Sequence, residues 1–325
     1  MPTSHAVAFE HVIKEYQTGK RVVDDVCLDV PSGEFVVLLG PSGCGKTTLL
    51  KSVNRLVDPS SGVVRVDGAD VHSVEPTALR RGIGYVIQQI GLFPHMTIAE
   101  NVAVVPSLVG WPRERIAARV EEMLELVGLP GTQFGARFPA ALSGGQQQRV
   151  GLARAIAADP AIMLMDEPFG AIDAIERSRL QGELLALQRQ LKKTVLFVTH
   201  DVDEALRLAD RIVVMRAGKV VQYATPLEIV ARPSDAFVAE LVGAGDLVRM
   251  LGLMHVGDVP LLAPEPSRAG PPIAFGADLR SALSRMLDLG TTRLAVASDD
   301  GRVTGTLTFE RMVEAAHAIA GRQQP

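Results

Sequence analysis

The chain has few of the features that would place it among several common classes of protein. Its 325 residues include only two cysteines, Cys27 and Cys44, and no metal-ligand spacing, so neither a disulfide framework nor a zinc site is expected. No apolar run approaches the roughly 18 to 20 residues that span a bilayer. The first residues, Met-Pro-Thr-Ser-His-Ala, lack the basic segment and apolar core of a signal peptide. We therefore expect a cytosolic protein.

The chain also lacks an excess of positive charge. Its formal net charge is −4 at pH 7, and no block of basic residues is present. A general nucleic-acid binder carries a basic face, so the composition argues against a nucleic-acid partner. Apolar residues at 47% and charged residues at 22% are ordinary for a globular protein, and the length predicts about two domains.

One stretch of the sequence predicts a phosphate-binding loop. It follows the apolar run Phe35–Leu39 and leads into a helical pattern, which is the strand–loop–helix order that such a loop requires. Its glycines let backbone N–H groups turn toward phosphate oxygens, the lysine reaches the β- and γ-phosphates, and the first threonine ligates Mg²⁺. The alternative is an ordinary glycine-rich turn, which would match this motif by chance in about one chain of this length in a hundred. The residues are Gly40, Pro41, Ser42, Gly43, Cys44, Gly45, Lys46, Thr47 and Thr48.

Two acidic residues follow a second apolar run, in the sequence Met-Leu-Met-Asp-Glu-Pro at 163–168. A carboxylate at the end of a buried strand binds Mg²⁺, and the next one polarises the attacking water. Two acids that merely begin a loop are the alternative. Because nucleotide hydrolysis needs a second acidic partner, we assign the metal to Asp166 and the base to Glu167.

A second anion site is expected where Leu-Ser-Gly-Gly-Gln, residues 142–146, opens a helix over 147–158. Ser143 is a suitable N-cap, and Gly144 and Gly145 allow a ligand to approach the backbone closely. Unpaired N–H groups at a helix N-terminus bind anions. Together with Gln146, these residues form a pattern that average composition would produce far less than once in a thousand chains.

Strands and helices alternate along most of the chain. Continuous apolar runs at 35–39, 83–87, 162–165, 195–198 and 212–215 are typical of strands in a buried parallel sheet. Residues 90–158 form a helical block inserted between them. This pattern predicts an α/β fold that binds its ligand at the carboxyl ends of the strands. Beyond Gly245, one short helix, a hairpin and a final helix predict a separate small α+β module.

The motifs together resemble the ATP-binding subunit of an ABC transporter. They are the phosphate loop, residues 142–146, residues 163–168, Ala171-Ile172-Asp173 and Thr199-His200. The resemblance covers about residues 5–243. It implies a P-loop NTPase with a RecA-like sheet core, whose two copies sandwich two ATP molecules. Each phosphate loop would then face the Ser143–Gln146 segment of the other subunit.

The resemblance assigns roles to three further residues. His200 corresponds to the residue that contacts the γ-phosphate, and Gln88 to the glutamine that contacts the metal and relays to the membrane subunits. Gln89 is an adjacent competitor, but the spacing to Leu-Phe-Pro at 92–94 favours Gln88. Tyr16 lies where the family stacks an aromatic ring on adenine, an interaction worth roughly 1 to 3 kcal/mol by analogy with base stacking elsewhere.

Two sub-patterns resemble importers of quaternary-ammonium osmoprotectants such as glycine betaine, carnitine and choline. They are Val-Asn-Arg-Leu at 53–56 and the stretch 84–97. The C-terminal module resembles a single, degenerate cystathionine-β-synthase (CBS) motif over 279–313, with 256–258 as its expected opening strand. Arg311 stands where nucleotide-binding copies have an aspartate, so adenosine sensing and simple dimerisation both remain open.

The sequence therefore predicts an ABC ATP-binding domain at 1–243 and a CBS-like regulatory domain at 246–325. The resemblance implies ATP and Mg²⁺ as cofactors and a homodimer bound to two transmembrane permease subunits. It also implies an indirect link to a periplasmic or lipid-anchored substrate-binding protein, and a place at the cytoplasmic face of the membrane. The alternatives are an importer ATPase for another small solute, such as amino acids, and a soluble ABC ATPase without a role in transport.

Overall fold

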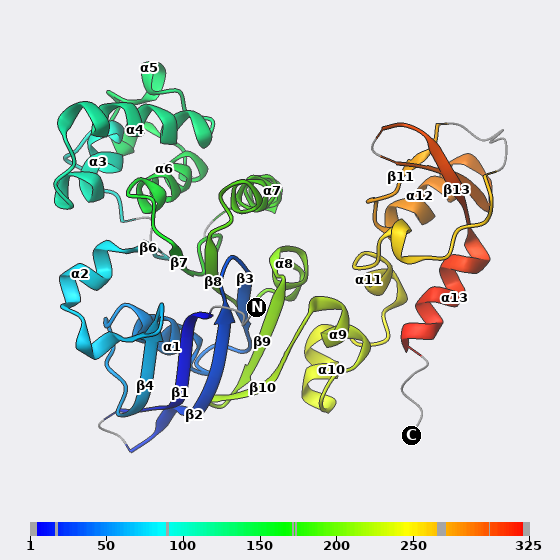
Figure 1. The fold of residues 1–325 in the computed structure, drawn as a ribbon, viewed down its shortest axis with the longest axis horizontal. Coiled ribbons are helices and arrows are strands. Elements are labelled where there is room, and N and C mark those ends of the chain that lie inside the picture. Colours follow the sequence, from blue (N-terminus) through cyan, green and yellow to red (C-terminus); the bar gives the residue numbers. More distant parts are fainter. Residues whose placement is uncertain are drawn as a thin grey trace. The chain divides into compact units, whose positions relative to one another are not determined.

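The computed structural model describes residues 5–16, 19–88, 91–170, 172, 174–264, 271–298 and 300–320. Its contacts group the chain into two compact units, Met1–Tyr223 and Ala224–Pro325 (Figure 1). The helices α9 (Pro226–Ala231) and α10 (Ala236–Val242) pack on each other, and α9 packs on α11 (Leu247–Leu251), so residues 224–242 belong to the second unit by contacts. The functional boundary near 243 stays a prediction.

A six-stranded sheet forms the centre of the first unit. The strand order is β10 (Lys219–Ala224), β9 (Arg211–Arg216), β3 (Phe35–Leu39), β8 (Thr194–Thr199), β7 (Ile162–Asp166) and β6 (Ile83–Val86). Every residue of β3, β7 and β8 is buried, as expected for strands covered on both faces. Neighbouring strands from β9 to β6 in this order pair in parallel.

The order of these strands positions the predicted site. Strands β3, β8, β7 and β6 are consecutive neighbours and run in the same direction. Their carboxyl ends therefore lie along one edge of the sheet, where the phosphate loop follows β3, Asp166 ends β7 and Glu167 follows it. The predicted α/β P-loop fold is confirmed.

The N-terminal strands form a separate antiparallel sheet, which the sequence analysis did not distinguish. Its order is β2 (Arg21–Pro31), β1 (His5–Glu15), β4 (Ser61–Val66) and β5 (Ala69–Asp70). Burial alternates along much of β2, so one face of this sheet packs on the core and the other meets solvent. Buried residues from both sheets and from α1 (Lys46–Val53) make one hydrophobic cluster, which includes Phe9, Leu38 and Leu49.

The inserted helical block is present, although its helices span 98–156 and not 90–158. Helix α3 (Ile98–Leu108) begins with a capping box between Thr97 and Glu100. The others are α4 (Arg113–Leu126), α5 (Gly131–Phe134) and α6 (Gly144–Ile156). These helices lie together in Figure 1, in green and cyan-green. Outside the block, α2 (Pro76–Arg81), α7 (Ala174–Leu191) and α8 (Val202–Leu208) connect the strands.

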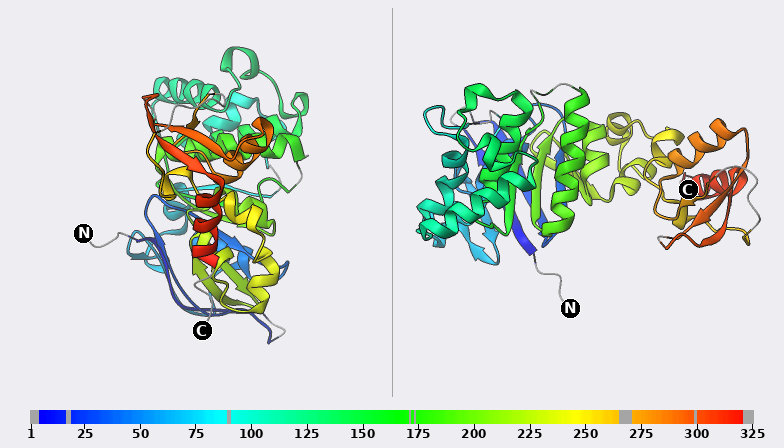
Figure 2. Two further views of the ribbon diagram at one scale, coloured as in Figure 1. Left: turned by 90° about the vertical axis from the view of Figure 1, so that its right-hand side faces the viewer. Right: turned by 90° about the horizontal axis from the view of Figure 1, so that it is seen from above.

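The second unit contains the predicted small α+β module. Its sheet has the order β11 (Ile273–Ala274), β12 (Arg293–Ala297) and β13 (Val303–Thr308), with β11 parallel and β13 antiparallel to β12. Helices α12 (Leu279–Leu289) and α13 (Phe309–Ala320) pack on it, and Figure 2 shows them from two further sides in orange and red. Strand β11 precedes the short helix and is not among the elements expected from the sequence.

The prediction of an opening strand at 256–258 is wrong. Residues Val256–Asp258 form a single 3₁₀ turn, because the Asp258 N–H donates to the His255 carbonyl at 3.0 Å. The Asp258 carboxylate also accepts a hydrogen bond from the His255 N–H at 2.8 Å, which closes the turn from its other side.

In the described part of the chain, no helix combines the length and the apolar character needed to cross a membrane.

Candidate functional site

The phosphate loop wraps around the ammonium group of Lys46. The Nζ atom donates to the carbonyl oxygens of Gly40 at 2.6 Å and Pro41 at 3.0 Å, and the residue is only 4% exposed. Gly45 caps α1 with φ +108°, and a Cβ there would lie 2.3 Å from the Val22 carbonyl oxygen. Only glycine fits this position. The tip of the loop, Pro41, Ser42 and Gly43, is exposed, while Cys44 is buried and Thr47 and Thr48 are half-buried.

The two predicted magnesium ligands are in contact. The Thr47 hydroxyl donates to Asp166 Oδ1 at 2.8 Å, although the residues are far apart in sequence. Two cis ligands of an octahedral Mg²⁺ ion at about 2.0–2.1 Å are themselves about 2.9 Å apart, so this oxygen pair fits the ion. The Lys51 ammonium lies 3.7 Å from Asp166 Oδ2. The carboxylate therefore already faces positive charge.

Glu167 and His200 form a pair at the ends of β7 and β8. Glu167 Oε2 lies 3.3 Å from His200 Nδ1, and both line a small hollow with Thr199 and Asp201. Glu167 has φ +45°, a left-handed conformation that is rare for this residue. Its N–H still donates to the Val198 carbonyl at 3.0 Å. This turn at the strand end brings the predicted base to the predicted histidine, a pairing that the sequence analysis did not foresee.

Arg177 is a site residue that the sequence analysis missed. Its Nη2 donates to the Ile172 carbonyl at 2.9 Å, and its Nη1 lies 3.6 Å from Asp201 Oδ2. The guanidinium thus connects the loop after Glu167 with the residue that follows His200. Because Arg177 lies in an ordinary helical pattern, no sequence signal marks it. Ala171 and Asp173 of the predicted motif lie outside the described residues.

Glu204 of α8 is a second missed residue, and it is only 6% exposed although it lines the same hollow as His200. Its Oε1 accepts from Gln181 Nε2 of α7 at 2.9 Å. Burial raises the pKa of Glu204, while hydrogen bonds from Thr199 and Gln181 oppose that shift. The carboxyl group therefore ties the loop of His200 to helix α7.

Strand β6 contains Tyr85 and leads to Gln88 at the same edge. Val86 pairs with Met165, so Gln88, which is exposed, follows β6 beside the acids that end β7. Burial and the nearby Asp166 carboxylate raise the pKa of Tyr85 to about 12, so its phenol stays neutral. Gln89, the competitor for Gln88, lies outside the described residues.

Tyr16 lies just beyond the end of β1, at the end of the sheet that is nearest the phosphate loop. Glu15 pairs with Arg21, and Val22, the next residue, approaches Gly45. Tyr16 is 44% exposed, and Lys14 Nζ lies 5.2 Å from the centroid of its ring. An exposed ring in this position is available for stacking.

The Leu142–Gln146 segment forms a capped helix start, as predicted. Helix α6 begins at Gly144, three residues before the predicted start, because Ser143 and Gln146 close a capping box. The Ser143 Oγ accepts from the Gln146 N–H at 3.3 Å, and the Gln146 side chain accepts from the Ser143 N–H at 3.0 Å. These residues and Gly145 line an open cavity of 670 Å³ with Arg149. No phosphate-loop residue lines it, so the two predicted anion sites are separate surfaces of the unit.

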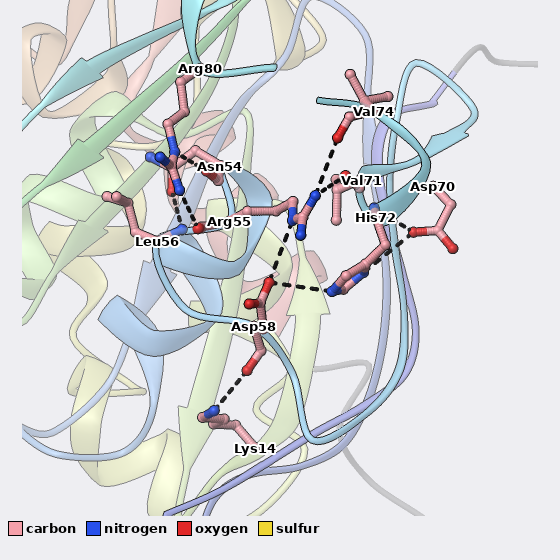
Figure 3. Close-up of polar contacts among 10 residues, drawn as sticks. All are labelled: Lys14, Asn54, Arg55, Leu56, Asp58, Asp70, Val71, His72, Val74 and Arg80. Atoms are coloured by element: carbon pink, nitrogen blue, oxygen red, sulfur yellow. Dashed lines mark hydrogen bonds and ion pairs between the residues drawn. The ribbon is translucent and has the colours of Figure 1, made fainter. Parts of the chain in front are cut away.

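A polar network fixes the far end of the phosphate-loop helix (Figure 3). Arg80 of α2 donates to the carbonyl oxygens of Asn54 at 3.0 Å and Arg55 at 2.6 Å. Arg55 in turn donates to the carbonyls of Val71 and Val74. The Asn-Arg-Leu sequence at 54–56 therefore connects α1 to α2, the helix that leads directly into β6 and Gln88.

The fold and this constellation define a P-loop nucleoside triphosphatase. A lysine-centred loop, a threonine–aspartate pair and a glutamate–histidine pair lie along one edge of a parallel sheet. Comparison with known proteins identifies the family within this class. A family model described as ABC transporter matches residues 23–170.

The osmoprotectant import ATP-binding protein OsmV of Salmonella typhimurium is 46% identical over 320 residues, which cover 96% of this chain and 81% of OsmV. The glycine betaine/carnitine/choline transport ATP-binding protein OpuCA of Bacillus subtilis is 53% identical over 240 residues, which cover 74% of this chain and 63% of OpuCA. A solved dimeric structure of the ATP-binding cassette MJ0796, bound to ADP and Pi, matches with a TM-score of 0.61 and 33% identity over 68% of this chain and 98% of that chain. This chain belongs to the ABC transporter family and is one of its ATP-binding proteins, an ATPase.

The burial of Glu204 predicts a specific pH dependence of stability. Because its folded-state pKa is raised, folding favours the protonated acid, and burying the carboxylate costs stability above the folded pKa. That cost disappears below the unfolded pKa of about 4.3. We expect the stability of Glu204→Gln relative to the wild type to increase as pH rises from about 4.3 through the raised pKa.

Urea denaturation at several pH values measures this difference. The exposed neighbour Asp203 provides the control, because Asp203→Asn removes a carboxylate from the same helical turn without removing a buried one. A Glu204→Gln difference that stays constant over this pH range would show that the buried group is not the cause.

Proposed function

We propose that this chain hydrolyses MgATP to energise the uptake of quaternary-ammonium osmoprotectants such as glycine betaine, carnitine or choline. The observation that carries the proposal is the match to OsmV, which extends over 96% of the chain and therefore includes the C-terminal unit as well as the cassette. OpuCA, which is named for three such compounds, supports the same solute class over the cassette. An importer of another small solute, such as amino acids, is the second candidate.

The chemistry follows from the contacts at the sheet edge. Thr47 and Asp166 would hold Mg²⁺ with Gln88, and the ion supplies charge neutralisation at the phosphate oxygens. Lys46 binds the β- and γ-phosphates, and Tyr16 stacks on adenine. These roles rest on the family resemblance together with the 2.8 Å contact between Thr47 and Asp166.

Glu167 is the proposed base. Its carboxylate accepts the proton of the attacking water, and His200, 3.3 Å away, orients that carboxylate and contacts the γ-phosphate. Arg177 acts only by position, because it holds the loop of Ile172 against Asp201. Because the base and the histidine are held in place, less entropy is lost when the reactive geometry forms.

A homodimer completes the proposed centre. The capped start of α6 presents Ser143, Gly144, Gly145 and Gln146 to a cavity that no phosphate-loop residue of the same unit lines. In the proposed dimer this surface covers the ATP held by the other copy, as an additional helix N-terminus for the phosphates. The MJ0796 cassette, solved as a dimer, supports this assembly. Two transmembrane permease subunits would bind the dimer at the cytoplasmic face of the membrane, and a substrate-binding protein would deliver the solute to them.

The C-terminal unit is proposed to be a CBS-like module that does not bind adenosine. Arg311, at the position of the ribose-binding aspartate, pairs with Glu314 at 3.8 Å and offers no carboxylate. Lys46→Ala removes nucleotide binding at the phosphate loop, so we expect this variant of the full chain to bind no adenine nucleotide in equilibrium dialysis. One nucleotide retained per chain would instead indicate a sensing module.

The role of Glu167 is tested by Glu167→Gln. The amide keeps the size of the side chain but cannot accept the proton, so we expect ATP binding to persist while turnover falls at least ~10²-fold. Size-exclusion chromatography with ATP should show a trapped dimer. Glu114→Gln, an exposed change on α4, is the matched control and should leave turnover unaltered. Near-normal turnover in Glu167→Gln would remove this residue from the mechanism.

The transport function is tested by co-expression with the two permease subunits and the substrate-binding protein of the proposed importer, followed by reconstitution into liposomes. Glycine betaine, choline or carnitine should stimulate ATP hydrolysis and accumulate, and Glu167→Gln should abolish both effects. Accumulation of amino acids alone would favour the second candidate. Co-purification with nucleic acid, and not with hydrophobic subunits, would favour a soluble ABC ATPase.

A further inference from the structure

Three side chains of different chemistry gather on the antiparallel sheet, outside the nucleotide site. They are His11 of β1 and Asp25 and Cys27 of β2, and one potential ligand atom from each lies within 4.8 Å of the other two. His11 Nδ1 lies 2.8 Å from Asp25 Oδ1, and the His11 N–H donates to Cys27 Sγ at 3.3 Å. All three residues are exposed, so solvent ions reach them freely.

Two β-bulges bring these donors together. Strand β1 places residues 10 and 11 opposite Cys27 alone, and strand β2 places residues 24 and 25 opposite Ile13 alone. A bulge changes the direction of a side chain that regular alternation would fix. Here the two bulges lie on opposite strands, on either side of the pair Val12–Val26.

The backbone at both bulges is in an uncommon conformation. His11 has φ +51° and Asp25 has φ +55°, both in the left-handed region. The neighbouring strand β4 accommodates the first bulge with Gly62, where a Cβ would lie 2.2 Å from the His11 carbonyl oxygen. Local strain of this kind is concentrated at ligand-binding and catalytic positions in proteins.

The donor set selects a class of ion. Imidazole nitrogen, thiolate sulfur and carboxylate oxygen are the ligands of Zn²⁺, whereas Mg²⁺ and Ca²⁺ take oxygen ligands. Two other histidines in the described residues pair with aspartates, His72 with Asp58 and Asp70 and His255 with Asp258, and neither shares a hydrogen bond or an ion pair with a cysteine there. The sulfur therefore distinguishes the group at His11 from ordinary ion pairs.

We propose that His11, Asp25 and Cys27 bind a divalent ion of the zinc class, with three protein ligands and a fourth position open to solvent. Binding replaces the His11–Asp25 contact by two metal bonds. The imidazole ring proton moves from Nδ1 to Nε2 through solvent, which frees Nδ1 for the ion, and the thiol proton of Cys27 is released to solvent because the thiolate is the ligand. The His11 N–H already donates to the sulfur at 3.3 Å, which keeps the Cys27 side chain beside the first bulge. The site does not depend on ATP hydrolysis or on the transported solute.

Titration of the full chain with Co²⁺, without nucleotide or thiol reductant, tests the proposal. Co²⁺ stands in for Zn²⁺ and reports a sulfur ligand through a thiolate-to-metal charge-transfer band. We expect one Co²⁺ per chain, displaced by Zn²⁺, and no band in Cys27→Ser. His11→Asn and Asp25→Asn should lower Zn²⁺ affinity at least ~10-fold. Asparagine tolerates the left-handed conformation, so these variants preserve the bulges.

His72→Asn is the matched control. His72 lies between Asp58 and Asp70 without a sulfur partner (Figure 3), so its replacement should leave the band and the Zn²⁺ affinity unchanged. Absence of the band in the wild type, its persistence in Cys27→Ser, or equal losses in His11→Asn and His72→Asn would each overturn the proposal.

A second measurement needs no variant. Cys27 is exposed and Cys44 is buried, so iodoacetamide should alkylate Cys27 first, as mass spectrometry of the peptides will show. Zn²⁺ should slow this alkylation at least ~10-fold because the metal occupies the thiolate. Alkylation of Cys27 at the same rate with and without Zn²⁺ would contradict the site.

Discussion

The 2.8 Å hydrogen bond from the Thr47 hydroxyl to the Asp166 carboxylate is the contact on which the site depends. It joins the first turn of α1 to the end of β7, across the intervening strand β8. The contact is possible because β3, β8 and β7 are parallel neighbours whose ends form one edge. The helix and the strand therefore present the two oxygens at the same point, with the spacing that Mg²⁺ requires.

The remaining site residues keep this edge in a defined geometry. Glu167 leaves β7 in a left-handed conformation and meets His200 at the end of β8. Arg177 of α7 donates a charge-assisted hydrogen bond to the loop at Ile172, and Glu204 of α8 accepts a hydrogen bond from Gln181 of α7. Because charge-assisted bonds are stronger than neutral ones, the Arg177 contact positions its loop while leaving the site itself polar and open.

The first unit has a nucleotide edge and, separately, the capped helix start of α6 beside an open cavity. In a single copy, the nucleotide edge and the start of α6 do not line a common cavity. One copy alone therefore cannot enclose a triphosphate between these two surfaces. The proposed dimer resolves this incompleteness, because each copy supplies what the other lacks. The zinc-class site proposed on the antiparallel sheet belongs to neither surface, and it would act independently of the catalytic cycle.

Much of this protein could be predicted from local sequence. The Gly40–Thr48 loop, the acids at 166 and 167 and the N-cap Ser143 are short motifs whose chemistry follows from residue type and spacing, and the buried strands have continuous apolar runs. Element limits were less certain: α6 starts at Gly144, and 256–258 is a 3₁₀ turn, because side-chain caps of one or two hydrogen bonds decide such boundaries.

Contacts between distant segments were decided only by the tertiary structure. The separate antiparallel sheet, the Arg177 bridge, the buried Glu204 and the group of His11, Asp25 and Cys27 depend on which segments pack together. No spacing in the sequence reveals that Cys27 faces a bulge in β1, because strand pairing and its irregularities set that contact. The sequence by itself determined the phosphate-binding chemistry and the class of fold, since both are local patterns. The tertiary structure decided which charged groups meet, since those contacts arise only when the strands are assembled in order.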